Sequence, residues 1–301
     1  MESKACLLSD KPEKKNGVLP LSVSKIKTFK DCPAKYRFSY IEKLPSVETD
    51  YLIFGKFVHE ILENFHKTYL DPQLPLFQEK HNIVMGSCFN FSYENWKSKL
   101  TKDQKQKAFE ICSLYLKQLS ENIKNNIQPK VLAVEEEFFI SIDEKILFTG
   151  FIDRVQIDPD GVLHVADYKT SNNISTLKKD FLQLLTYAFV KCLQNPELKK
   201  VRTSYILLKH DLKSIVKEFD VEEIMKVENS ILEYADKINK EKLYRPTITP
   251  LCNWCPFQVE HCEEGRKVIP HPKSPNYEAL IAWQRNNAQS QNIVKFGISD
   301  W

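Results

Sequence analysis

The pattern of hydrophobic and polar residues along the chain predicts helices on both sides of a group of strands. Four long segments repeat apolar residues with helical spacing: residues 54–69, 105–125, 181–193 and 222–239. A shorter helix is expected between Ser22 or Ser24 and Phe29. Between residues 131 and 170 the spacing changes to two, which predicts three strands, and residues 201–209 form another strand. This order predicts a mixed α/β (α+β) fold in which helices flank a central sheet.

Proline and glycine divide the chain into three parts. Residues 1–20 are polar and contain Lys-Pro, Asn-Gly and Leu-Pro steps, so we expect a flexible lead-in. Residues 21–269 hold the periodic segments and are expected to form the main domain. Residues 270–301 begin with Pro270-His271-Pro272-Lys273-Ser274-Pro275, which predicts a linker to a polar C-terminal tail.

Composition narrows the class of protein. The chain has 43 Lys and Arg against 40 Asp and Glu, so its net charge of +3 creates no general attraction to nucleic acid or membrane. It contains no run of 18 apolar residues, which predicts no membrane-spanning helix and no membrane partner. Eight cysteines without a signal-peptide core indicate thiols or metal ligands in a reducing compartment, and we expect a cytoplasmic location.

The strongest chemical signal lies in a predicted hairpin. The segment Asp158-Pro159-Asp160-Gly161-Val162 suits a three-residue connection with glycine in the left-handed position. This turn places Asp153 opposite Asp167 on an otherwise apolar face, and Lys169 points the same way. Opposed carboxylates repel each other unless a hard cation such as Mg²⁺ or Mn²⁺ lies between them. The alternative is a solvated Asp–Lys surface pair, which the apolar neighbours disfavour.

Four motifs in order then resemble the RecB-like branch of the PD-(D/E)XK nuclease superfamily. They are Gly55–Glu63 (G-x-x-x-H-x-x-L-E), Gly150–Asp153 (G-x-x-D), Asp167–Thr170 (D-Y-K-T) and Gln183–Tyr187 (Q-x-x-x-Y). The resemblance implies a restriction-endonuclease-like core with a helical insertion at about residues 70–130. It also implies a divalent metal, Mg²⁺ or Mn²⁺, held by His59, Asp153, Asp167 and the Tyr168 carbonyl. It further implies catalytic roles for Lys169, Gln183 and Tyr187. The helical neighbours of His59 alone favour a hydrogen-bonded core residue over a metal ligand, and the match of the flanking Gly55 and Leu62-Glu63 to the motif reverses that preference.

Three cysteines form a second group. Cys252, Cys255 and Cys262 lie within eleven residues, a spacing that suits an iron–sulfur cluster or zinc. Cys32 resembles the N-terminal cysteine of relatives in which one early and three late cysteines hold a four-iron four-sulfur cluster. The resemblance therefore implies a 4Fe-4S staple that joins the N- and C-terminal parts through the loop at residues 252–262. Zinc, with Cys32 or His261 as the fourth ligand, stays the alternative.

The expected function is a metal-dependent DNA exonuclease acting on single strands or duplex ends in DNA repair, recombination or phage DNA processing. Lys35, Tyr36 and Arg37, near Cys32, are candidate DNA contacts, although lysine-rich segments are often merely solvated. No helicase-type phosphate loop is visible, so we expect unwinding to come from a helicase, recombination or adaptation partner. Two alternatives are a CRISPR adaptation nuclease that trims spacer precursors and a nucleic-acid-binding scaffold with a vestigial site.

Overall fold

The structure is a computed structural model that describes residues 3–13, 17–70, 80–171 and 174–287. It divides into two units, each formed by two separate segments of the chain. Met1–Pro20 and Glu48–Leu232 form the first, which we call the sheet unit. Leu21–Val47 and Glu233–Trp301 form the second, which we call the cysteine unit. Within the described residues, no helix is both long and apolar enough to cross a lipid bilayer.

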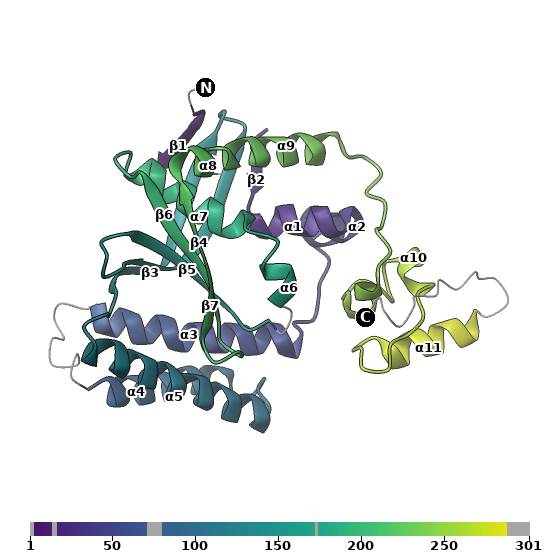
Figure 1. Cartoon of the computed structure of the whole chain (residues 1–301). Helices are drawn as coiled ribbons and strands as arrows, with labels where there is room; N and C mark the ends of the chain where they lie inside the picture. The colour runs from purple at the N-terminus through teal and green to yellow at the C-terminus, as the bar shows by residue number, and fades with distance from the viewer. Residues whose placement is uncertain (1–2, 14–16, 71–79, 172–173, 288–301) are drawn as a thin grey trace. The chain divides into compact units, whose positions relative to one another are not determined.

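The sheet unit is built on a seven-stranded sheet with the strand order β1-β3-β4-β5-β6-β7, and β2 pairs with β4 (Figure 1). Strands β5 and β6 are parallel, whereas the pairs β1–β3, β3–β4, β4–β5 and β6–β7 are antiparallel. The strands are β1 (Ala5–Leu8), β2 (Leu19–Leu21), β3 (Lys130–Ile142), β4 (Ile146–Ile157), β5 (Leu163–Lys169), β6 (Lys200–Leu207) and β7 (Lys213–Asp220). The parallel pair needs a crossover, which contains α6 (Ile174–Leu177) and α7 (Leu182–Gln194).

The predicted hairpin turn and its register are confirmed. Val155 lies opposite Val165, and Ile157 lies opposite Leu163. The amide of Asp158 donates a 3.0 Å hydrogen bond to the carbonyl of residue 162, which closes a three-residue turn. Gly161 has φ of +81°, the left-handed conformation that glycine adopts without strain. Local turn chemistry therefore sets the pairing that brings the two aspartates together.

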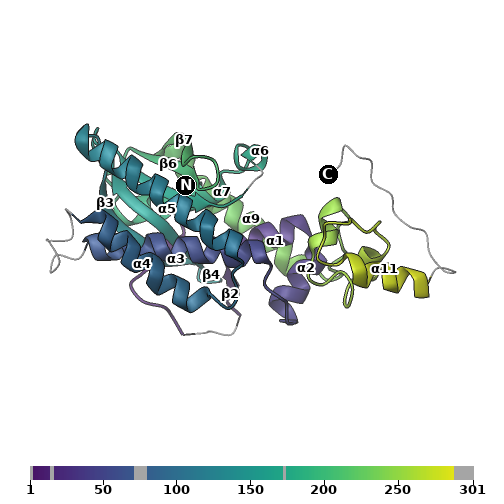
Figure 2. The same ribbon diagram turned by 90° about the horizontal axis from the view of Figure 1, so that it is seen from below.

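Three helices form a layer beside the sheet, as both ribbon views show (Figures 1 and 2). They are α3 (Asp50–Leu70), α4 (His81–Trp96) and α5 (Lys102–Lys124), and the last two occupy the predicted helical insertion. Helix α3 has apolar residues at helical spacing, and Phe57, Ile61 and Phe65 are fully buried in a cluster with Tyr168 of β5. Burial of this face holds α3 against the end of β5, where the predicted site residues lie.

The cysteine unit is assembled from short helices. From the N-terminal segment come α1 (Val23–Asp31), α2 (Pro33–Tyr36) and a π-helical turn, Arg37–Ile41. From the C-terminal segment come a 3₁₀ turn (Pro250–Trp254), α10 (Glu263–Arg266) and α11 (Tyr277–Asn286). The rings of Phe38 and Phe257 meet with centroids 5.4 Å apart in a small core that joins the two segments. Two further helices, α8 (Val221–Met225) and α9 (Val227–Lys240), precede the C-terminal part, and α9 begins in the sheet unit and ends in the cysteine unit.

The structure differs from the sequence expectations in three places. Residues 1–20 contain β1 and most of β2, because backbone pairing with β3 and β4 orders a segment whose own composition is polar. Strand β7 was not expected, since most of its residues are polar and exposed at the sheet edge. Helix α11 lies within the predicted tail. The rest of that tail, residues 288–301, lies outside the described residues.

Candidate functional site

The candidate site lies where β5 separates from β4. Their pairing ends at Arg154 opposite Ala166, whereas β4 continues to pair with β3 as far as Ile146. Asp153 and Asp167 are the next positions beyond that last pair, and their side chains are buried, with 8% and 1% exposure. The carboxylate of Asp153 accepts a 2.8 Å hydrogen bond from the amide of Tyr168. At this fork, the point where β4 and β5 separate, a hydrogen bond to the Asp153 side chain takes the place of backbone pairing between the strands. It fixes the position of the Asp153 carboxylate.

His59 comes to the same point from α3. Its Nε2 atom lies 3.0 Å from the carbonyl oxygen of Tyr168, which fits the tautomer with the ring hydrogen on Nε2. Its Nδ1 atom then offers a lone pair 3.5 Å from Oδ2 of Asp153. Burial lowers the pKa of His59, which favours the neutral ring that a metal ligand needs. Gly55 allows the close approach of α3, because a Cβ there would lie 3.2 Å from Oγ1 of Thr170.

Glu135 of β3 is a further acidic residue at this point, and sequence reasoning missed it. Its Oε1 atom lies 4.0 Å from Nδ1 of His59. One ligand atom each from His59, Glu135 and Asp153 lies within 4.8 Å of the others. Glu135 has φ of +46°, an unusual conformation for a residue with a side chain. The sequence did contain a signal, an acidic residue in the strand that precedes the strand of Asp153. Because the register between β3 and β4 was unknown, that residue could not be placed beside Asp153.

The charges around these acids alter their titration. Burial, followed by the charge of Asp167, raises the pKa of Asp153 well above its usual value. Burial and the nearby carboxylates of Glu63 and Asp167 raise the pKa of Glu135 to about 7. Such shifts are the expected result of packing carboxylates together away from water. A cation between them would remove the repulsion, so one imidazole nitrogen and two carboxylates fit a Mg²⁺ or Mn²⁺ ion.

Lys169 and Asp167 form the second part of the site. The Nζ atom of Lys169 lies 2.5 Å from Oδ2 of Asp167 and donates a 3.0 Å hydrogen bond to Oε1 of Gln183. The amide nitrogen of Gln183 in turn donates to the hydroxyl of Tyr187, 2.8 Å away. The structure thus brings together all of the predicted residues of the D-Y-K-T and Q-x-x-x-Y motifs. Asp167 lies outside the three-residue ligand group in the structure, and its role as a metal ligand stays a prediction.

The site is open to solvent. A pocket of about 500 Å³ is lined by His59, Glu135 and Lys169, together with Tyr168 and residues of α3. A bound strand could reach the acidic residues through this opening without unfolding any element.

The four predicted cluster cysteines lie together in the cysteine unit. Cys32, Cys252, Cys255 and Cys262 line one pocket of about 170 Å³. Backbone amides point at three of the sulfur atoms: Thr247 donates to Cys32 at 3.5 Å, Thr249 to Cys252 at 3.4 Å and Gly265 to Cys262 at 3.3 Å. Hydrogen bonds of this kind stabilise metal-bound thiolates. Burial raises the pKa of Cys252, Cys255 and Cys262, so a metal is needed to keep these thiols ionised at neutral pH.

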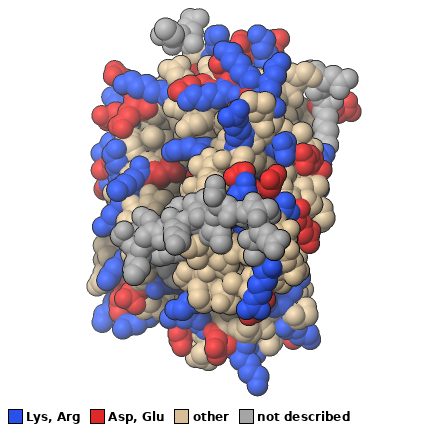
Figure 3. Space-filling model, turned by 90° about the vertical axis from the view of Figure 1, so that its right-hand side faces the viewer, with Lys and Arg blue, Asp and Glu red and all other residues tan. Residues whose placement is uncertain are grey.

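The predicted DNA contacts are only partly accessible. Tyr36 is 4% exposed and its ring packs against Phe29 and Tyr244, so it is not available to stack on a base. Arg37 pairs with Glu42 at 2.9 Å, and Lys35 is partly exposed. On the face drawn in Figure 3, Lys and Arg side chains lie beside Asp and Glu side chains. We therefore withdraw Tyr36 as a base-stacking residue and keep Lys35 and Arg37 as predictions.

Comparison with known proteins agrees with this geometry. The family model of the PD-(D/E)XK nuclease superfamily matches residues 20–260. A subunit of an ATP-dependent helicase/deoxyribonuclease from Streptococcus agalactiae is 29% identical over 177 residues, which are 56% of this chain and 16% of that protein. The corresponding protein from Streptococcus pyogenes is 24% identical over 160 residues, or 52% of this chain and 14% of that protein. The chain thus spans less than a fifth of the length of these curated relatives.

The chain is also similar to a solved structure from Eubacterium rectale that is described as an exonuclease. It has a TM-score of 0.45 and 12% sequence identity, covering 78% of this chain and 86% of that one. The family match extends over most of the chain and includes the four motifs at the fork. The chain belongs to the PD-(D/E)XK nuclease superfamily.

Proposed function

We propose that this protein is a metal-dependent DNA exonuclease that hydrolyses phosphodiester bonds in single strands or at duplex ends. The observation that carries the proposal is the convergence of His59, Glu135 and Asp153 beside the Lys169–Asp167 pair. Membership of a nuclease superfamily supports the reaction type. The solvent-open pocket supports a polymer substrate.

The residues that would hold Mg²⁺ or Mn²⁺ are His59, Glu135 and Asp153, with Asp167 and the Tyr168 carbonyl as further candidates. A divalent ion bound there supplies an activated water and neutralises charge on the phosphate. Lys169 contributes a fixed positive charge at the same edge. The charges of Asp167 and Asp153 outweigh burial, which alone would lower the pKa of Lys169, and raise that pKa. Gln183 and Tyr187 hold the lysine in place through their chain of hydrogen bonds.

We also propose that the four cysteines hold a 4Fe-4S cluster. The all-sulfur donor set suits an iron–sulfur cluster or zinc and not a hard cation. The family resemblance favours the cluster, and the backbone amides that point at three of the sulfur atoms support it.

The curated relatives suggest the biological setting. They are named as ATP-dependent helicase/deoxyribonuclease subunits, and this chain aligns with a small part of them. We propose that the protein acts in DNA repair or recombination in the cytoplasm, with unwinding supplied by a separate helicase.

Digestion of labelled oligonucleotides with Mn²⁺ tests the proposal. Linear and circular single strands of one sequence are compared, with wild type beside Asp153→Asn. We expect wild type to degrade the linear strand and spare the circle, and the variant to lose cleavage while it still binds the strand. Cleavage of the circle would contradict the exonuclease assignment. Binding without cleavage by wild-type protein loaded with Mn²⁺ would instead favour a scaffold with a vestigial site.

A further inference from the structure

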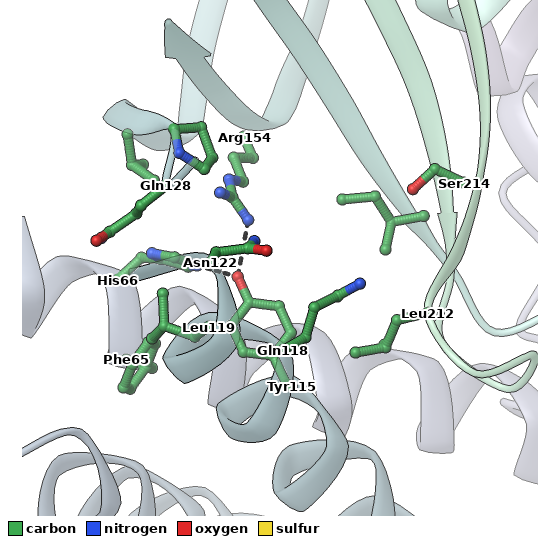
Figure 4. A pocket seen from close by; sticks show the side chains of 13 residues that line it. Phe65, His66, Tyr115, Gln118, Leu119, Asn122, Gln128, Arg154, Leu212 and Ser214 are labelled. Carbon is green, nitrogen blue, oxygen red and sulfur yellow. Dashed lines mark hydrogen bonds between the residues drawn. The ribbon is translucent and has the colours of Figure 1, made fainter. Parts of the chain in front are cut away.

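A second polar pocket lies on the other side of β4, away from the candidate metal site. Arg154 directly follows Asp153, and neighbouring side chains of a strand point to opposite faces. The guanidinium of Arg154 extends into a pocket of about 80 Å³ between the sheet and α5 (Figure 4). Its buried floor is made by Phe65, His66 and Tyr115. The side chains of Gln118, Asn122 and Ser214 form a more exposed rim.

Among the described residues, the positive charge in this pocket forms no ion pair with a carboxylate, and the nearest acidic influence is the charge of Asp158 outside the pocket. Arg154 is 8% exposed, and its hydrogen bonds run from Nη1 to the hydroxyls of Tyr115 at 2.7 Å and Tyr168 at 3.3 Å. The thirteen residues that line the pocket include no Asp or Glu. A buried charge is costly unless it is paired, and neutral hydroxyls do not neutralise it. The pocket is therefore electropositive and open to an anion.

Two buried nitrogen atoms in the pocket also lack a hydrogen-bond partner. One is the Nε atom of Arg154, a donor that is buried and makes no hydrogen bond. The other is Nδ1 of His66, a residue that is 3% exposed. The Nε2 atom of the same ring lies 2.5 Å from the hydroxyl of Tyr115. Buried polar atoms of this kind are rare unless a ligand or water pairs with them.

We propose that this pocket binds a phosphate group, with the Arg154 guanidinium as its anchor. Arginine recognises tetrahedral oxyanions through its planar set of donors. The pocket is much smaller than the 300 Å³ or more that is typical of sites for whole small molecules, so it takes one phosphate group and not a complete nucleotide. The group comes either from free inorganic phosphate or from the terminal phosphate of a nucleic acid. The site is separate from the metal site, because the two lie on opposite faces of β4.

Phosphate binding also reaches the metal site through Tyr168. The hydroxyl of this residue accepts from Arg154, and its backbone carbonyl faces Nε2 of His59. A phosphate that draws the guanidinium toward itself changes the contact that holds the Tyr168 ring. The pocket is thus placed to sense phosphate next to a site that acts on phosphodiesters.

Titration calorimetry of the full chain with inorganic phosphate, without added divalent metal, tests the proposal. We expect one saturable site. Asn122→Asp adds a negative charge at the rim, where the residue is partly exposed and the fold is spared, and it should weaken binding at least about tenfold. Asn90→Asp makes the same change on the exposed face of α4 and should leave binding unchanged. Arg154→Gln should abolish binding, with circular dichroism to verify folding.

The source of the phosphate is distinguished with two oligonucleotides that carry either a terminal phosphate or a terminal hydroxyl. Tighter binding of the phosphorylated strand, lost in Asn122→Asp, assigns the pocket to nucleic-acid ends. Equal binding of both strands, with inorganic phosphate still bound, assigns it to free phosphate. Absence of saturable binding of either probe, or binding that Asn122→Asp leaves unchanged, overturns the proposal.

Discussion

The ammonium nitrogen of Lys169 lies 2.5 Å from Oδ2 of Asp167, two residues earlier on the same face of β5. Burial alone would lower the pKa of Lys169, but the charges of Asp167 and Asp153 outweigh it and raise the pKa. In the metal-free site this lysine is therefore held in its protonated form. We expect it to act as a fixed positive charge and hydrogen-bond donor and not as a general base.

This assignment predicts the behaviour of Lys169→Met. We expect cleavage of labelled DNA to fall at least about a hundredfold, since a positioned charge and donor is lost. Mn²⁺ binding, measured by calorimetry, should persist because the ligand group is intact. Lys179→Met, at an exposed position, is the control and should retain full activity. Full cleavage activity of Lys169→Met would contradict the assignment.

Glu135 predicts a pH dependence of stability in the metal-free protein. Its pKa rises from the ordinary 4.5 to about 7 in the folded state, so the folded protein binds this proton more tightly than the unfolded chain. The contribution of Glu135 to the free energy of unfolding is thus most favourable below about pH 4.5 and is lost as the pH rises toward about 7. Glu135→Gln should remove this dependence. Because the lowered pKa of buried His59 acts in the opposite sense, the quantity to measure is the difference between wild type and variant.

Thermal unfolding of both proteins in chelator at several pH values gives that difference. We expect the variant to gain stability relative to wild type as the pH rises from about 5 to about 7.5. Mg²⁺ at the upper pH should stabilise wild type and have a smaller effect on the variant. Glu137→Gln, at an exposed position on the same strand, should follow wild type. Parallel curves for wild type and Glu135→Gln would show that Glu135 is not in the acidic group.

Local chemistry explains which parts of this site could be predicted. Pro159 and Gly161 restrict the turn after β4 to one length, so the register that leads to Asp153 and Asp167 followed from the sequence. The turn between β3 and β4 lacks such residues. Asp143 and Glu144 adopt φ of +50° and +53° there, which nothing in their chemistry requires. The register of β3, and with it the position of Glu135, depends on tertiary packing.

Sequence periodicity also could not predict that each unit is built from two separate segments of the chain. Strand β1 pairs with β3 across more than a hundred residues, and its own pattern is too short to predict a strand. The grouping of Cys32 with Cys252, Cys255 and Cys262 came from a family resemblance and not from local pattern. Pairings of long sequence separation cost loop entropy that no local propensity reflects.

Gly55 predicts a coupling between α3 and the end of β5. Alanine at a helix position ordinarily stabilises by about 1 kcal/mol over glycine. At Gly55 the added Cβ would lie 3.2 Å from Oγ1 of Thr170, so we expect Gly55→Ala to gain less than this and to lower cleavage by displacing His59. Gly86→Ala on α4, where nothing lies within 4 Å, should show the full gain.

A double-mutant cycle with Thr170→Ala separates the contact from helix propensity. Removing Oγ1 should relieve the Cβ of Gly55→Ala, with a coupling free energy of about 0.5 kcal/mol or more in urea unfolding. If the two substitutions change the free energy of unfolding additively, α3 does not press on Thr170. The same four proteins, assayed for cleavage, report whether displacement of α3 reaches His59.

Cys32 is the N-terminal member of the proposed cluster. We expect it to be needed for both the colour and the stability of the purified protein. Purified anaerobically, wild type should be brown, with about four irons per chain as the family resemblance implies. Cys32→Ser should lose the cluster, because Cys32 is the member contributed by the other chain segment of the cysteine unit. A tie between residues 32 and 252 closes a loop of about 220 residues, for which loop entropy gives an upper stabilisation of about 5 kcal/mol. The variant should therefore unfold at lower temperature and lose nuclease activity indirectly.

Cys6→Ser, at an exposed position outside the pocket, should change neither colour nor stability. Colourless wild-type protein with one zinc per chain would defeat the iron–sulfur assignment and leave the nuclease proposal standing.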